Sequence, residues 1–309
     1  MGSNPTLCTL QEPQNFLSYL LTKTTLERGT IKRRVRALKS LAVHVDLFVS
    51  DSVVEFLNKC TWKNGTKNIV LLAYRDWLRM YGLPELKLRK FHVVQQLPFI
   101  PLESELDALI SGSRFRLACF LELLKETGIR PIEAWRLEWK DFDVVQKTVN
   151  VRTAKHGNPR ILPVTERFLN MLGGFGKRDD LVFSPSGSSD RFSIELDHFT
   201  RNFTKQRKRL ADKLKSPRLG QISLYTFRHW KATMTYLKTR DIFFVKEMLG
   251  HTRIENTLKY VHVANAISID QGNYSCKVAR SIEEATALIE SGFEYVTEID
   301  GLRFFRKRK

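Results

Sequence analysis

The chain has 309 residues, 42% of them hydrophobic, and its 51 Lys and Arg against 33 Asp and Glu give a formal net charge of +18. This length predicts two domains with a substantial core, and the positive excess favours nucleic acid as partner. No segment reaches the roughly 18 consecutive apolar residues of a membrane span, and the four scattered cysteines form no C-x-x-C pair. We therefore expect a reduced, cytoplasmic protein associated with the nucleoid, without structural zinc and away from membranes.

Apolar residues recur at helical spacing from residue 1 to about 82, as in Val53, Phe56 and Leu57. The first domain, 1–82, is therefore predicted to be helical. Residues 83–101 combine three prolines with a basic cluster and carry no helical stripe, which indicates an interdomain linker.

The second half begins with helical patterns over 103–111 and 114–126, followed by Gly128 and a further helix that starts at Pro131. The segments TVNVRTAK and RILPV, separated by HGN, predict a small β-hairpin with Lys155 at the end of its first strand. A long basic helix is expected over 193–215, and the chain to residue 263 is predicted to be helical.

Five scattered polar residues suit chemistry on a phosphodiester. Arg130 and Arg228 each carry a guanidinium fork that matches two phosphate oxygens, and Tyr260 offers a phenol that can attack phosphorus. Lys155 can supply a proton to the leaving alkoxide. The fifth residue, His251, follows Gly250 and stands nine positions before Tyr260. The sequence has no acidic metal cluster and no glycine-rich nucleotide loop, so we expect no metal and no cofactor.

The strings ETGIRPIEAWRLEWKDFD, VRTAKHGNPRILPV, TFRHWKAT and LGHTRIENTLKYVHV resemble, in order and spacing, the active-site boxes of the tyrosine recombinases, or phage integrase family. The match covers roughly residues 105–265. It implies a mainly α fold with a small β-hairpin or sheet, in which a helical core-binding domain and a catalytic domain over 102–265 form a C-shaped DNA clamp. The residues implied as catalytic are Arg130, Lys155, Tyr225, Arg228, His251 and Tyr260, with Glu133 in support.

Within this resemblance, Tyr260 is the nucleophile, Arg130 and Arg228 clamp the phosphate, and Lys155 is the general acid. His251 is implied as a hydrogen-bonding partner of the phosphate or the phenol, and we expect that it can titrate near neutral pH. Tyr225 departs from the family, which usually has His or Lys at that position. A tyrosine stays a neutral donor, so we expect it to give a hydrogen bond and move no proton.

His229 directly follows Arg228, and both a packing role and a direct role stay open for it. The basic segment 29–39, the hairpin turn and the long basic helix are candidate DNA contacts, although a basic run can also be only a solvated helix face. These candidates are Lys32, Arg33, Arg34, Arg36, His156, Arg207, Lys208 and Arg209.

The tail, 266–309, is predicted to form a helix plus a hairpin and resembles tails of archaeal plasmid and viral integrases. The expected function is site-specific recombination of double-stranded DNA through a 3'-phosphotyrosine, as a homo-tetramer, in integration or excision of a mobile element. A type IB topoisomerase and a catalytically silent DNA-binding protein are the alternatives.

Overall fold

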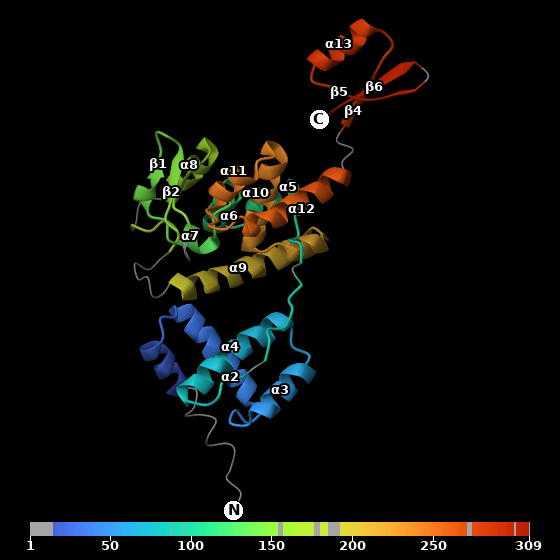
Figure 1. The fold of residues 1–309 in the computed structure, drawn as a ribbon. Coiled ribbons are helices and arrows are strands. Elements are labelled where there is room, and N and C mark those ends of the chain that lie inside the picture. The colour runs from blue at the N-terminus through green and yellow to red at the C-terminus, as the bar shows by residue number, and fades with distance from the viewer. Residues whose placement is uncertain are drawn as a thin grey trace, which may run out of the picture. The chain divides into compact units, whose positions relative to one another are not determined.

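The computed structural model divides the chain into two compact units, Met1–Gln96 and Leu97–Lys309 (Figure 1). The division falls inside the segment 83–101. Most elements are helices, and the second unit adds two small antiparallel sheets, so the predicted mainly α fold with a small sheet is confirmed. The residues that the structure describes are 15–86, 88–94, 96–153, 157–175, 180–184, 192–270, 274–299 and 301–308.

The first unit is a helical bundle built around α2 and α4. Its helices are a segment over 15–23, α2 (Arg28–Ala42), α3 (Ser50–Lys59) and α4 (Asn64–Met80). Every third or fourth residue of α2 is buried, and this stripe packs with Tyr74 and Trp77 of α4 in one core. The chain after α4 stays on this core, because Asn68 exchanges two hydrogen bonds of 2.8 and 2.9 Å with the backbone of Phe91.

The second unit is organised around α10, which packs against both α6 and α12. Helix α6 is buried along most of its length, and α10 also packs against α11. The helices are α5 (Glu103–Ser111), α6 (Phe115–Thr127), α7 (Pro131–Trp135), α8 (Glu166–Gly173), α9 (Phe192–Lys213), α10 (Leu224–Thr239), α11 (Ile242–Leu249) and α12 (Glu255–Asp270), with short 3-10 turns at η1 (Trp139–Asp141) and η2 (Pro217–Gln221).

The hairpin belongs to a three-stranded antiparallel sheet in the order β1 (Phe142–Asp143), β2 (Thr148–Val151) and β3 (Arg160–Pro163). Strand β1 extends the hairpin predicted from the sequence. In the β2–β3 register Val149 lies opposite Leu162, and both side chains are buried. Lys155 and His156 belong to the connection between β2 and β3 and lie outside the described residues.

The C-terminal segment has a sheet and a small core of its own. It comprises β4 (Tyr274–Ala279), α13 (Ile282–Glu290), β5 (Glu294–Ile299) and β6 (Leu302–Arg308), with β6 central in the sheet order β4-β6-β5. Ala279, Ala285 and Phe305 form its buried cluster. The sequence predicts only a helix and a hairpin here, so β4 is an addition. No helix among the described residues is long and apolar enough to cross a membrane.

Candidate active site

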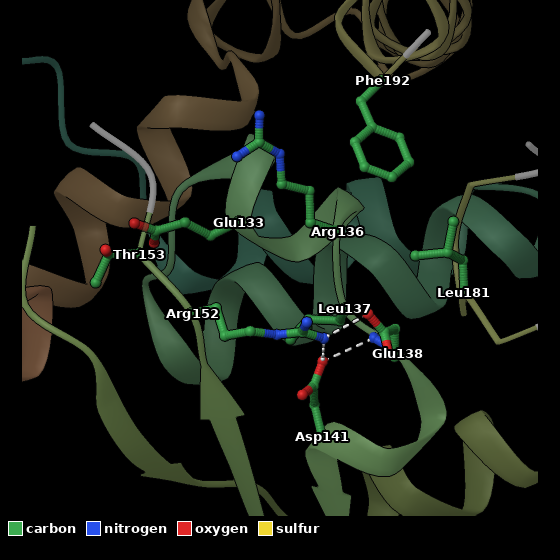
Figure 2. A pocket seen from close by; sticks show the side chains of 9 residues that line it. All are labelled: Glu133, Arg136, Leu137, Glu138, Asp141, Arg152, Thr153, Leu181 and Phe192. Carbon is green, nitrogen blue, oxygen red and sulfur yellow. Dashed lines mark hydrogen bonds and ion pairs between the residues drawn. The ribbon is translucent and has the colours of Figure 1, made fainter. Parts of the chain in front are cut away.

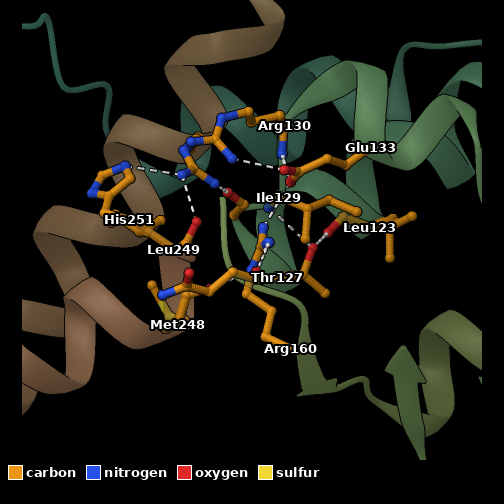
Figure 3. A network of polar contacts seen from close by, with 12 residues as sticks. Leu123, Thr127, Ile129, Arg130, Glu133, Arg160, Met248, Leu249 and His251 are labelled. Atoms are coloured by element: carbon orange, nitrogen blue, oxygen red, sulfur yellow. Dashed lines mark hydrogen bonds and ion pairs between the residues drawn. The ribbon is translucent and has the colours of Figure 1, made fainter. Parts of the chain in front are cut away.

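Arg130 and Glu133 form one unit at the start of α7. Gly128 ends α6 in the left-handed region, with φ of 65°, and Pro131 occupies the first turn of α7. The carboxylate of Glu133 accepts a bond of 2.9 Å from the backbone N of Arg130 and one of 2.7 Å from its Nη1 (Figure 3). Glu133 therefore caps the helix and orients the guanidinium of Arg130 with the same group.

Arg160, at the first position of β3, is a site residue that the sequence analysis missed. Its side chain is 6% exposed and donates from Nη2 to Oε2 of Glu133 at 2.7 Å and from Nε to the carbonyl oxygen of Met248 at 2.9 Å. Burial opposes ionisation of Glu133, but Arg160 and Arg130 hold the pKa of Glu133 below its ordinary value. Arg160 thus joins the hairpin to α11 and to the residue that orients Arg130.

Gly250 makes this junction possible. Its φ is +66°, and a Cβ atom there would lie 2.7 Å from Nη1 of Arg160 and 2.8 Å from the carbonyl oxygen of Asn158. The backbone N of Asn158 also donates to the carbonyl oxygen of Gly250 at 3.3 Å. The glycine therefore ends α11 and admits the close approach of the hairpin.

Arg228 lies on α10 and is only 3% exposed. It donates from Nη1 to the carbonyl oxygen of Gly128 at 2.8 Å and from Nη2 to that of Leu249 at 2.7 Å. Burial, assisted by the nearby charge of Arg130, lowers the pKa of Arg228 to about 10, so it remains a cation at neutral pH. The α6–α7 turn and the end of α11 together hold this guanidinium in place.

His251 follows Gly250 and is buried with both ring nitrogens engaged. Nε2 lies 3.0 Å from Nη2 of Arg228, and Nδ1 lies 2.9 Å from Oγ1 of Thr257. Because a guanidinium only donates, Nε2 accepts, and Nδ1 carries the hydrogen. Burial and then Arg228 lower the pKa of His251 to about 3. This neutral form corrects the expectation that His251 titrates near neutral pH.

Tyr260 lies on α12 and is 1% exposed. Its hydroxyl contacts Nδ1 of His229 at 3.0 Å, so in this structure His229, and not His251, is the histidine at the phenol. Burial raises the pKa of Tyr260 to about 12, while Arg228 and Arg130 act to lower it. The positive charges of both arginines thus partly offset the effect of burial on the phenol.

Tyr225 lies in the first turn of α10 and is 49% exposed, although Arg228, three residues later, is buried. None of the described residues hydrogen-bonds to its hydroxyl. The general-acid candidate Lys155 lies outside the described residues. The structure thus brings Arg130, Arg228, His251 and Tyr260 together and leaves Tyr225 at the surface.

The DNA-contact candidates divide into internal and exposed residues. Arg34 pairs with Asp76, which is buried, and the guanidinium of Arg207 donates to the carbonyl oxygen of Ile222 and lies over the ring of Phe203. These two arginines therefore hold their own domains together. Those exposed to solvent are Lys32, Arg33, Arg36, Lys208 and Arg209, while His156 lies outside the described residues.

A pocket of about 240 Å³ adjoins the site, and Glu133 contributes to its wall (Figure 2). Within it, Nη2 of Arg152 lies 2.7 Å from Oε1 of Glu138 and 2.7 Å from Oδ2 of Asp141. These two carboxylates hold Arg152 where the chain leaves β2.

A model of the phage integrase family matches residues 102–266, more than half of the chain. The chain is 29% identical over 182 residues to tyrosine recombinase XerC of Roseiflexus sp., a match that covers 57% of this chain but only 55% of that protein. It is 31% identical over 262 residues to tyrosine recombinase XerC of Chlamydia trachomatis serovar L2, covering 81% and 72% of the two chains.

An archaeal relative is a probable integrase/recombinase protein of Methanocaldococcus jannaschii, 29% identical over 214 residues, with 63% of this chain and 64% of that protein covered. Among solved structures, the fold resembles XerH site-specific recombinase bound to its difH substrate, with a TM-score of 0.60 and 17% identity over 88% of this chain and 98% of that one. The residues that resemble the family's boxes lie within the matched segment. The chain therefore belongs to the phage integrase family of tyrosine recombinases, enzymes that break and rejoin DNA at specific sites.

Proposed function

We propose that the protein cuts and rejoins double-stranded DNA at specific sites through a 3'-phosphotyrosyl intermediate on Tyr260, in the integration or excision of a mobile element. The observation that carries this proposal is the buried cluster in which Nη2 of Arg228 lies 3.0 Å from Nε2 of His251, and the hydroxyl of Tyr260 lies 3.0 Å from Nδ1 of His229, the residue after Arg228. The positive charges of Arg228 and Arg130 oppose the rise that burial causes in the pKa of Tyr260. Two fixed cations beside a phenol suit an anionic phosphodiester whose charge increases during attack.

In the proposed reaction, Arg130 and Arg228 bind the non-bridging oxygens of the scissile phosphate. Oη of Tyr260 attacks phosphorus, the bond to the 5'-oxygen breaks, and Lys155 protonates that oxygen. The neutral His251 carries its hydrogen on Nδ1 toward Thr257 and uses Nε2 to hold Arg228. Glu133 positions Arg130 by a direct ion pair, and Arg160 in turn holds Glu133.

The exposed cations of the first unit, Lys32, Arg33 and Arg36 on α2, supply phosphate contacts within a DNA-binding domain over 1–82. We assign the catalytic domain to 102–265 and expect a homo-tetramer on two recombination sites. Holliday-junction formation between two such sites would separate recombination from the strand passage of a type IB topoisomerase.

A suicide DNA substrate tests the proposal, because the cut strand diffuses away and traps the covalent intermediate. Parental protein should form an SDS-resistant adduct. Tyr260→Phe should bind the same DNA with equal affinity and form none. An adduct that persists in Tyr260→Phe would place the nucleophile elsewhere, and parental protein that binds but never forms an adduct would favour a catalytically silent DNA-binding protein.

The leaving-group role of Lys155 has a separate test. Lys155→Ala should cleave ordinary DNA about 10²- to 10⁴-fold more slowly. A 5'-bridging phosphorothiolate leaves without a proton and should restore most of the rate. Equal impairment on both substrates would contradict the general-acid assignment.

A further inference from the structure

The phenol of Tyr260 is held at one histidine. Oη lies 3.0 Å from Nδ1 of His229, and the two ring centroids are 5.8 Å apart at an interplanar angle of 44°. His229 follows Arg228 on α10, and Tyr260 lies on α12, which packs against α10. One helix therefore holds both a phosphate-binding candidate and the partner of the nucleophile.

Among the described residues, the other groups near the phenol do not accept its proton. The guanidinium groups of Arg130 and Arg228 only donate, and Lys259 presents an ammonium group 5.0 Å from the ring centroid of Tyr260. His251 has one nitrogen on Arg228 and the other on Thr257. Within the described part of the chain, His229 is the one proton acceptor that contacts the phenol oxygen.

The need for an acceptor follows from burial. A tyrosine that is 1% exposed cannot release its proton to bulk water, and burial disfavours the phenolate. Tyr225 does not fill this role, because it is itself a phenol and is half exposed. Burial, and then the charges of Lys259 and Arg228, lower the pKa of His229 to about 4, so the histidine is neutral and free to accept a proton. The negative charge of a bound phosphodiester would favour the imidazolium form by offsetting these cations.

We propose that His229 is a catalytic residue that accepts the proton of Tyr260 during attack and returns it during rejoining. In the forward step the O–H bond of Tyr260 breaks and its proton moves to Nδ1 of His229. The phenol oxygen forms the bond to phosphorus, the bond from phosphorus to the 5'-oxygen breaks, and that oxygen takes up its own proton. In the reverse step the imidazolium protonates the departing tyrosine oxygen.

This inference rests on the proposed function and is tested on the full chain with His229→Asn. The Asn amide can accept a hydrogen bond where Nδ1 lies, but it cannot carry the proton. Cleavage of the suicide substrate should slow by about 10²- to 10⁴-fold. Imidazole added to His229→Ala should restore part of the rate. His262→Asn, a matched change at an exposed position of α12, should cleave at the parental rate.

A second assay separates proton transfer from a structural role. An oligonucleotide with a 3'-(p-nitrophenyl phosphate) carries, in place of the tyrosine, a leaving group that needs no proton. In Tyr260→Phe, the 5'-hydroxyl of a second strand attacks this phosphorus and p-nitrophenolate leaves, so the rate of strand joining can be measured without the nucleophile. Adding His229→Asn to Tyr260→Phe should leave this joining rate unchanged. A rate that falls with the added substitution would overturn the proposal.

The inference would also be overturned if His229→Asn cleaved ordinary DNA at or above the parental rate, since the contact would then only restrain Tyr260. The proposed function would survive that result, because parental protein would still form the adduct. The proposed function itself would be refuted if the parental protein formed no covalent adduct with the suicide substrate.

Discussion

Replacement of Glu133 by Gln tests the support behind Arg130. Among the described residues, the carboxylate accepts bonds of 2.7 to 2.9 Å from the backbone N and Nη1 of Arg130 and from Nη2 of Arg160. An amide has one oxygen, so in its best orientation it keeps the two bonds at Oε2 and turns an NH₂ group toward Nη1 of Arg130. One charge-assisted bond is lost, at about 1.5 to 3 kcal/mol, and two donors face each other.

The change also leaves a buried cation without its counter-charge, because the side chain of Arg160 is only 6% exposed. Breaking a buried pair by removing one partner costs about 3 to 5 kcal/mol, and this is the loss we expect in the free energy of unfolding of the second unit. A guanidinium of Arg130 displaced by about 1 Å should slow DNA cleavage by about 10²-fold.

Denaturant unfolding of the full chain and cleavage of the suicide substrate measure the two effects. Glu138→Gln is the matched control, since Glu138 also pairs with an arginine but its side chain is 20% exposed, and we expect a loss below about 1 kcal/mol. The pKa of Glu133 is lowered, so its stabilisation is complete above the unfolded value of about 4.3 and is lost as the pH falls through the folded pKa. The difference between parent and Glu133→Gln should shrink accordingly below pH 4. A loss no larger than that of Glu138→Gln would refute the reasoning.

Three further predictions concern other parts of the chain. Tyr225→Phe should slow cleavage by at most about 10²- to 10³-fold, because one hydrogen-bond donor to the phosphate is lost. Tyr225→His should restore much of the cleavage rate, with a new pH dependence near neutrality. Cleavage by Tyr225→Phe at the parental rate would show that Tyr225 has only a packing role. The lowered pKa of His251, about 3, predicts that stability is complete above about 6.5 and falls as the pH drops toward 3, and His251→Asn should make this acid loss shallower in denaturant titrations. Removal of residues 271–309, a cut that leaves β4 undivided, should weaken tetramer assembly or DNA affinity, measured by sedimentation and gel shift, more than it slows cleavage; unchanged assembly and affinity would show the tail to be dispensable.

The sequence alone identified the elements whose signals lie between near neighbours. The stripe on α2 and the alternation of β2 and β3 are periodicities of 3.6 and 2, so they can be read without knowing the rest of the fold. The boxes around Arg130, Arg228 and Tyr260 are equally local, and they led to the family that the comparisons then showed. Strand β4 was not predicted, because its pairing partner, β6, lies more than twenty residues later in the sequence.

Only the tertiary structure decided which of these residues meet. The guanidinium of Arg228 bonds to a carbonyl group 100 residues away, and the phenol of Tyr260 to a histidine 31 residues away. The hydrogen-bonding partner of the phenol is therefore His229. Both ring nitrogens of His251 contact other residues, Arg228 and Thr257, and burial lowers its pKa so that it is neutral. Arg34 is a further example, because it pairs with the buried carboxylate of Asp76. The sequence of a basic helix is the same whether its arginine faces solvent or such a carboxylate, so the sequence alone did not predict this ion pair. Contacts of this kind depend on how whole helices pack, and no local pattern in the sequence records them.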